Sequence, residues 1–246
     1  RVLRNGALSS PVLLDNQSVF KGYPAAPEQT PSTWSQVPCA FGFTTDAGTG
    51  GQAKAVLWKG SSSASGGTLL LSDAFNRTGT SLGGSWGTYG LWRTDGRAYT
   101  DSTGADLAFT SGASCADCRV EANLIGFGVQ EVGVVARAQA ASPKDRYDVI
   151  LRPDGHLQIR RVISGTVTVL AEGPSGIADL GNWANLQLTV QGTAPVHLVA
   201  SVNGVQKLSA SDSSPGPLAQ AGHGGMWTDH AGVVFDDFAL WALGAQ

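Results

Sequence analysis

The chain has 246 residues, of which 42% are hydrophobic and 14% are charged, and its formal net charge is −3. A chain of this length and composition can bury a substantial core without structural metals or disulfides. The sequence contains no basic stripe and no apolar run of about 18 residues, so we expect no nucleic-acid partner and no membrane insertion.

The first 66 residues differ in composition from the rest of the chain and contain five of its eleven prolines. Residues 39–58 predict two strands around a glycine-rich turn at residues 46–51. The Ser/Gly-rich stretch at residues 61–67 is typical of a flexible linker. We therefore predict a small N-terminal β appendage with its linker over residues 1–66, and a main domain over residues 67–246.

The rest of the chain is a series of short strands. Residues 117–127 alternate between apolar and polar side chains, and we expect Cys118, Val120, Ala122 and Leu124 to point inward. Three hairpins are predicted further on, with turns at Asp154-Gly155, Ser164-Gly165 and Asn203-Gly204. Regular short strands, no convincing helix and no strict internal repeat together favour a sandwich or barrel over a propeller or solenoid.

The three cysteines are Cys39, Cys115 and Cys118. Cys115 and Cys118 form a C-x-x-C motif, but neither a βαβ pattern nor a second metal-binding pair accompanies it. A local disulfide or free thiols are therefore favoured over a redox motif or a zinc site. Whether Cys39 pairs is left open.

Four segments taken together resemble the concanavalin A-like lectin/glucanase superfamily. They are "LSDAFNRTGTSLGGSWGTYGLWRTDGRAYT", "VGVVARAQ" with "YDVILRPDG", "NWANLQLTVQG" with "VHLVASVNG", and "AGHGGMWTDHAGVVFDDFALW". The closest resemblance is to the LamG-like jelly rolls of bacterial extracellular proteins and phage minor tail proteins, over roughly residues 69–243. It implies an all-β antiparallel jelly-roll sandwich whose first and last strands lie side by side.

The resemblance also implies a structural calcium ion, because many relatives hold one with ligands from both terminal strands. Asp73 and Asp237 would supply the carboxylates, which are ligands of the type that calcium takes. Strand alternation predicts that Asp236 and Asp237 point to opposite faces. The alternative is that Asp236 is solvated and Asp237 bonds loop amides without an ion. In either case we expect Asp237→Ala to destabilise the fold more than Asp212→Ala.

A catalytic pair of carboxylates is not evident. Glucanases of the superfamily carry an E-x-D-x-E pattern, which is absent here, and the four glutamates, Glu28, Glu121, Glu131 and Glu172, lie far apart in sequence. No G-x-S-x-G motif accompanies the histidines. A non-catalytic protein is therefore favoured, and a glycoside hydrolase with an unrecognised acid pair remains an alternative.

The candidate carbohydrate-binding residues are Trp92, Arg137, Tyr147, Arg152 and Trp227. Trp92 and Trp227 are flanked by polar residues and glycines, as aromatic platforms for sugars are expected to be. Arg137 stands inside an apolar strand, which the resemblance places on the concave, ligand-binding sheet; Tyr147 and Arg152 on the next strand would line the same face. A structural salt bridge, for instance with Asp148, is the alternative for Arg137.

These features predict a non-catalytic carbohydrate-binding or adhesion module of a larger extracellular or surface assembly. Its partner would be a glycan or cell-surface polysaccharide, and residues 1–66 would contact partner subunits. The alternative is a structural or host-contact subunit of a phage tail. The composition, with little Lys or Cys and much Ser, Thr and Gly, favours a secreted protein or a virion-surface protein.

Overall fold

The structure is a computed structural model. It contains two compact units, Arg1–Ala64 and Ser65–Gln246. In the first unit it describes the backbone of β1 (Leu3–Arg4), β2 (Ala7–Leu8), β3 (Cys39–Thr44) and β4 (Lys54–Lys59). In the second unit it describes residues 67–126, 131–139, 145–177 and 181–244. β3 pairs with β4 in an antiparallel ladder, which confirms the two strands expected in residues 39–58. The predicted linker at residues 61–67 lies outside the described residues, except for Gly67.

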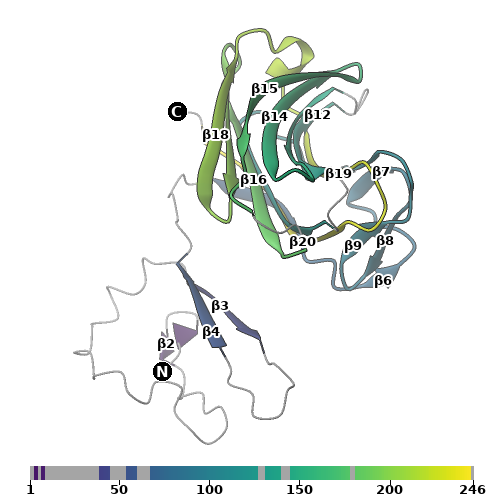
Figure 1. Cartoon of the computed structure of the whole chain (residues 1–246), viewed down its shortest axis with the longest axis vertical. Helices are drawn as coiled ribbons and strands as arrows, with labels where there is room; N and C mark the ends of the chain where they lie inside the picture. The colour runs from purple at the N-terminus through teal and green to yellow at the C-terminus, as the bar shows by residue number, and fades with distance from the viewer. Residues whose placement is uncertain are drawn as a thin grey trace, which may run out of the picture. The chain divides into compact units, whose positions relative to one another are not determined.

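The second unit consists of two antiparallel sheets that face each other (Figure 1). The seven-stranded sheet, here the front sheet, has the order β15 (Thr166–Pro174), β14 (His156–Ile163), β13 (Arg146–Leu151), β12 (Val132–Ala138), β19 (His223–Thr228), β10 (Asp106–Thr110), β7 (Trp86–Tyr89). The nine-stranded sheet, here the back sheet, has the order β18 (Val205–Asp212), β17 (Val196–Val202), β16 (Ala184–Gln191), β11 (Cys118–Ile125), β20 (Val234–Ala242), β9 (Ala98–Thr100), β8 (Trp92–Asp95), β6 (Thr78–Gly79), with β5 (Thr68–Asp73) also paired to β20.

The core lies between the two sheets and follows from strand alternation. On β11 the inward side chains Cys118, Val120, Ala122 and Leu124 are all at most 1% exposed, as the sequence pattern predicted. They meet inward residues of the front sheet, such as Val134 and Val149, in one hydrophobic cluster. The all-β sandwich prediction is therefore confirmed.

The predicted hairpin turns are also present. Ser164 and Gly165 have φ values of 50° and 81°, and Asn203 and Gly204 have φ values of 51° and 75°. Two consecutive positive φ angles belong to the type I′ turn, whose twist matches that of the paired strands. The turn at Asp154-Gly155 is present as well and has one positive φ, 80° at Gly155.

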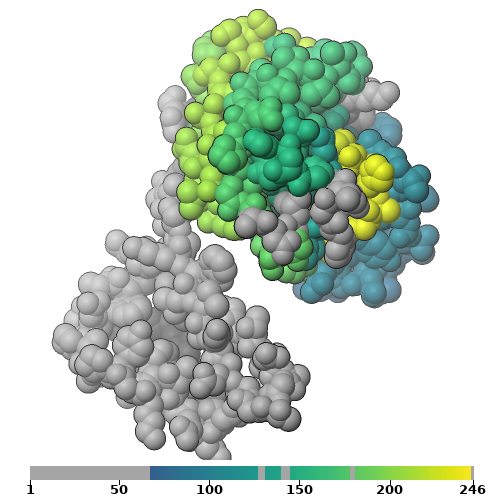
Figure 2. Space-filling view, viewed as in Figure 1, coloured from purple at the N-terminus to yellow at the C-terminus, as the bar shows by residue number. Residues whose placement is uncertain are grey.

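The first and last strands of the sandwich are neighbours, as the resemblance implied. β5 pairs with β20 along the back sheet, for example Phe238 with Asp73. The last strand of the second unit thus lies between β11 on one side and the early strands β5 and β9 on the other; in Figure 2 the yellow C-terminal residues lie between the blue and the green ones.

A β-bulge on β20 overturns the expected placement of the two aspartates. The register of β20 against β11 shifts between Glu121 and Asn123, and Asp237 has a φ of 48°. The bulge leaves both Phe235 and Phe238 inside the core, at 0% and 1% exposure. Asp236 and Asp237 stand together between these two phenylalanines, away from the core, so the prediction that they point to opposite faces is wrong.

No helix among the described residues has the length and apolar character that a membrane crossing requires.

Candidate functional site

The outer surface of the front sheet gathers the residues from which a site can be built. On β13, Tyr147, Val149 and Leu151 belong to the core, so Arg146, Asp148 and Ile150 point to the opposite surface. We call this surface the front face. The front face includes the side chains of Tyr89, Leu107, Phe109, Glu131, Val135, Arg146, Asp148, Arg152, Arg160, Glu172, His223 and Trp227.

One half of the front face is aromatic. The rings of Tyr89 on β7 and Phe109 on β10 stack with their centroids 6.1 Å apart, and Phe109 lies 5.7 Å from the ring of His223 on β19. Tyr89 is 52% exposed. Gly87 makes room for this arrangement, because a Cβ at that position would lie 2.5 Å from the Phe109 ring. These rings therefore form a solvent-accessible aromatic strip across three neighbouring strands.

The other half of the front face carries a network of ion pairs. Asp148 is fully buried and accepts hydrogen bonds from Arg160 Nε at 2.8 Å and Arg146 Nε at 3.0 Å. Arg160 Nη1 also binds Glu131 at 2.9 Å. Glu131 in turn contacts Arg152 at 3.3 Å, and Arg152 contacts Glu172 at 3.3 Å. The network thus runs from a buried carboxylate to half-exposed charges at the edge of the sheet.

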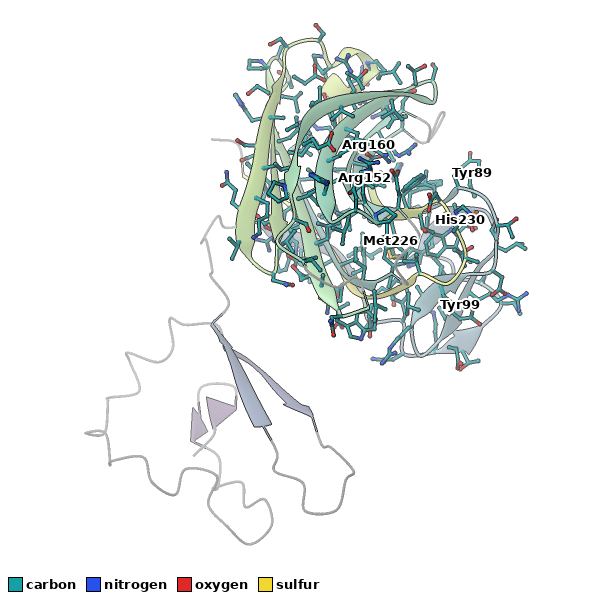
Figure 3. The ribbon with its side chains drawn as sticks, in the orientation of Figure 1. Tyr89, Tyr99, Arg152, Arg160, Met226 and His230 are labelled. Atoms are coloured by element: carbon teal, nitrogen blue, oxygen red, sulfur yellow. A yellow bond between two sulfur atoms is a disulfide. The ribbon has the colours of Figure 1, made fainter. Side chains whose placement is uncertain are left out.

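Trp227 joins the two halves. The guanidinium carbons of Arg160 and Arg146 lie 5.0 Å and 5.8 Å from the centre of its ring. Trp227 and Phe109 also pack on a small apolar cluster of Leu107, Val135 and Ala138, separate from the main core. The indole therefore contacts both cations and an apolar cluster. In Figure 3 the labelled side chains of Arg152 and Arg160 lie to the left of those of Tyr89 and His230.

Ion pairing controls the charge states in the network. Burial lowers the pKa of Arg160, but the neighbouring charges of Asp148 and Glu131 outweigh burial and raise that pKa overall. Burial is the largest influence on Arg146 and lowers its pKa, against the attraction of Asp148. Each carboxylate of the network pairs with a guanidinium. The network is therefore a set of mutually held groups that can donate and accept hydrogen bonds.

Of the five predicted carbohydrate-binding residues, two lie on the front face: Trp227 and Arg152. Trp92 is 3% exposed and packs against Phe235, with 5.6 Å between ring centroids. It is a core residue and not a platform.

The expectation that Arg137 lines the ligand-binding face is wrong, because its side chain is fully buried between the sheets. A bulge on β12 gives Arg137 a φ of 51° and turns it inward. There its guanidinium donates to the carbonyl oxygens of Ala116, Leu218 and Gly192 at 2.6, 2.8 and 2.7 Å. Arg137 thus ties three separate loops together at one end of the sandwich. Its ion pair is with Asp117, at 3.5 Å, and the suggested pair with Asp148 is not formed.

The same expectation is wrong for Tyr147, whose side chain is also fully buried. Its hydroxyl donates a hydrogen bond of 2.8 Å to Asp212 Oδ2, and Arg161 Nη1 binds Asp212 Oδ1 at 2.8 Å. Burial, together with the hydrogen bond to Asp212, raises the pKa of Tyr147. Asp212 is therefore a buried link between the two sheets.

Asp73 has no free site for a metal. It accepts hydrogen bonds from Arg77 Nη1 and Nη2 at 2.7 Å each, from Trp86 Nε1 at 2.8 Å and from the Phe75 backbone N–H at 2.9 Å. Four donors occupy the roughly four lone-pair sites of a carboxylate. Burial alone would raise the pKa of Asp73, but these donors, led by Arg77, lower it overall.

Asp237 bonds an amide, since Asn123 Nδ2 donates to its Oδ2 at 2.9 Å. Asp236 Oδ1 accepts a bond from the Asp237 backbone N–H, and burial raises the pKa of Asp236. Among the described residues no group of three or more His, Cys, Asp or Glu is placed to hold a metal ion. The donor set around Asp73 does not fit the calcium prediction, which remains to be tested.

Cys115 and Cys118 are joined in a disulfide, as the favoured local interpretation of the C-x-x-C motif included. The loop that it closes supplies the Ala116 carbonyl and the Asp117 carboxylate that hold Arg137. The disulfide therefore lies at the end of the sandwich where Arg137 ties the three loops together. The side chain of Cys39 lies outside the described residues.

Sequence reasoning missed five residues of the front face: Tyr89, Phe109, Arg146, Asp148 and Arg160. A signal was present in "RYDVIL", where Arg146 and Asp148 are two residues apart and therefore share a face. Arg160 faces Asp148 across the hairpin whose turn was predicted, so the register alone brings the two together. Tyr89 and Phe109 gave no comparable signal, because β7 and β10 are separated by two strands of the other sheet.

Comparison with known proteins shows the fold. No protein-family model and no curated protein matches the chain. Carbohydrate-binding module CBM66 of Bacillus subtilis is similar in structure, with 20% identity and a TM-score of 0.55 over 64% of this chain and 96% of the module. The β-glucanase of Bacillus licheniformis is similar at 10% identity, with a TM-score of 0.52 over 73% of this chain and 100% of the enzyme.

A third similar structure is β-agarase A in complex with oligoagarose, at 10% identity and a TM-score of 0.57 over 73% of this chain and 94% of the agarase. These neighbours share the concanavalin A-like lectin/glucanase fold, and the resemblance of the four sequence segments is thereby confirmed at the level of the fold. That fold is common to carbohydrate-binding modules, lectins and glycoside hydrolases.

Proposed function

We propose that the second unit is a non-catalytic carbohydrate-binding or adhesion module that takes a glycan on its front face. The observation that carries this proposal is the exposed stack of Tyr89 on Phe109 beside the Arg152–Glu131–Arg160 network. The apolar C–H surface of a sugar ring packs on aromatic faces, and its hydroxyls bond to fixed charged side chains. Both kinds of group are present on one surface and held by paired strands.

The pairing of the carboxylates favours binding over hydrolysis. A glycoside hydrolase needs a carboxyl that is free to give a proton to the leaving group. Asp148 and Glu131 both pair with the same guanidinium, that of Arg160. Glu172 likewise pairs with Arg152. These carboxylates are thus engaged by arginine donors, an arrangement that suits a rigid binding surface better than general-acid catalysis.

We further propose that the protein acts in an extracellular or particle-surface setting, as part of a larger assembly. The Cys115–Cys118 disulfide supports this location, because disulfides persist in oxidising environments. A structural or host-contact subunit of a phage tail is the alternative. In that case the front face would bind no glycan, and residues 1–66 would mediate assembly.

A glycan array followed by calorimetry tests the proposal. We expect binding of at least one oligosaccharide and a loss of about tenfold or more in affinity for Tyr89→Ala, since truncating a binding aromatic removes a large contact. Val205→Ala is the control, because Val205 is 58% exposed and belongs to β18 of the back sheet. An array without a hit, or equal losses for the two variants, would overturn the proposal.

A further inference from the structure

Arg146 uses only a small part of its hydrogen-bonding capacity. A guanidinium has five N–H donors. Arg146 Nε donates to Asp148 Oδ2 at 3.0 Å, and within the described parts of the chain neither Nη1 nor Nη2 donates to any acceptor. The side chain is only 9% exposed. Leaving most donors of a largely buried guanidinium without acceptors is unfavourable unless water or a ligand accepts them.

The unused donors of Arg146 are not fully buried. The fully buried side-chain atoms without a hydrogen-bond partner in the described residues are Thr94 Oγ1, Arg119 Nε and Trp241 Nε1. The Nη atoms of Arg146 are not among them, so each keeps some exposed surface. The Arg146 guanidinium carbon lies 5.8 Å from the Trp227 ring centre, so a group bound at these donors lies beside the aromatic half of the front face.

Arg146 has no carboxylate partner of its own among the described residues. It shares Asp148 with Arg160, and Arg160 also pairs with Glu131. The nearby carboxylate of Asp145 accepts a hydrogen bond from the Ser164 backbone N–H instead, and it forms no ion pair with Arg146 among the described residues.

Two further acidic side chains lie at the far end of β13. Arg152 pairs there with Asp154 and Glu172, and also with Glu131. Arg152 is six residues from Arg146 along the strand, a separation of about 20 Å at the usual rise per residue. Asp154 and Glu172 are therefore remote from the free donors of Arg146.

We propose that Arg146 makes the front face selective for glycans that carry a carboxylate, such as uronic acids, with the carboxylate bound by Nη1 and Nη2 of Arg146. A planar guanidinium edge matches a carboxylate in a two-bond geometry. The pyranose ring of the same sugar would then lie toward Trp227 and the aromatic strip. This inference rests on the proposed binding of glycans and adds the chemical class of the ligand.

The test compares acidic oligosaccharides with their own methyl esters, which keep the sugar and remove the charge. Galacturonan and alginate oligomers, each with its methyl ester, are titrated into the full chain by calorimetry. We expect an acid to bind about tenfold or more tighter than its ester, because a hydrogen bond between charged groups is stronger than a neutral one. This preference should weaken as salt is added.

Two variants assign the preference to one residue. Arg146→Gln should bind acid and ester equally. Arg119→Gln should keep the preference, because Arg119 also stacks on a tryptophan, Trp241 at 4.8 Å, but does so on the back sheet. Should Arg146→Gln fail to fold, Arg146→Lys is the substitute: it keeps the charge but lacks the planar pair of donors, so it should reduce the preference for the acid.

Two results would overturn the inference: equal affinity of the native protein for acid and ester, or an acid preference that survives Arg146→Gln. Binding of neutral glycans without any acid preference would overturn this inference and leave the proposed function standing. A failure to bind any glycan would overturn both the selectivity for acidic glycans and the proposed function.

Discussion

The hydroxyl of Tyr147 and the carboxylate of Asp212 form a 2.8 Å hydrogen bond that joins the two sheets. Tyr147 belongs to β13 of the front sheet and Asp212 ends β18 of the back sheet, and they are 0% and 4% exposed. Arg161 and the Ser214 backbone N–H bind the same carboxylate. The bond therefore holds one margin of the sandwich closed.

This relationship reverses the expectation that Asp237 is the harder aspartate to lose. We expect Asp212→Asn to lower the free energy of unfolding by about 2–4 kcal/mol, because the partly buried Arg161 guanidinium and the buried Tyr147 hydroxyl lose a charged acceptor. Asp237→Asn should change it by less than about 0.5 kcal/mol, since the site is exposed and Asn tolerates a positive φ. Urea unfolding of both variants decides the order, and a larger loss for Asp237→Asn would contradict this account.

Arg137 should be indispensable for stability and irrelevant for ligand contact. Replacing it by Met leaves three carbonyl groups, one of them fully buried, without this donor, and we expect a loss of about 3–5 kcal/mol. Arg93→Met is the control, because the Arg93–Asp101 pair is close to half exposed and such pairs contribute at most about 1 kcal/mol. If thermal unfolding shows similar midpoints for both variants, the central role of Arg137 is wrong.

The Asp73–Arg77 pair predicts a defined pH dependence. Its donors lower the pKa of Asp73 below the ordinary value of 3.8, so the folded state favours the ionised carboxylate. The stabilisation is complete above pH 3.8 and is lost as pH falls through the lower pKa of the folded state. Asp73→Asn should therefore unfold more easily than the native protein at pH 7, by about 2 kcal/mol, and this difference should shrink under acid conditions. A difference that is independent of pH would point to another cause.

The filled donor sites of Asp73 also make a prediction about calcium. We expect thermal unfolding to be the same with and without EDTA, because binding an ion only to the native state would raise the midpoint and Asp73 has no site to offer. A midpoint that falls with EDTA and returns with added calcium would show that the ion-binding prediction from the resemblance was right after all.

Much of the fold could be predicted from sequence patterns because alternation and turn chemistry act locally. The inward set on β11 follows from period-two alternation, and Asn203-Gly204 encodes its type I′ turn by itself. The neighbouring positions of β5 and β20 came from the resemblance, since the two strands are separated by most of the domain.

Two bulges account for the errors at Arg137 and at the aspartate pair. Alternation from Val134 and Ala136 places Arg137 outside, but its positive φ turns it into the core. On β20 the extra residue puts Asp236 and Asp237 on the same side. The second bulge left a trace in the sequence, because Phe235 and Phe238 are three residues apart and a regular strand cannot bury both. The bulge on β12 left no such trace, because an arginine in an apolar strand is normally expected on the outer surface and not in the core.

The most direct test of the central claim is a glycan-array screen with the native chain, followed by calorimetry on the hits with Tyr89→Ala and Val205→Ala. The account predicts at least one oligosaccharide ligand whose affinity falls about tenfold or more in Tyr89→Ala and is unchanged in Val205→Ala. An array without any ligand, or a ligand indifferent to Tyr89, would contradict it.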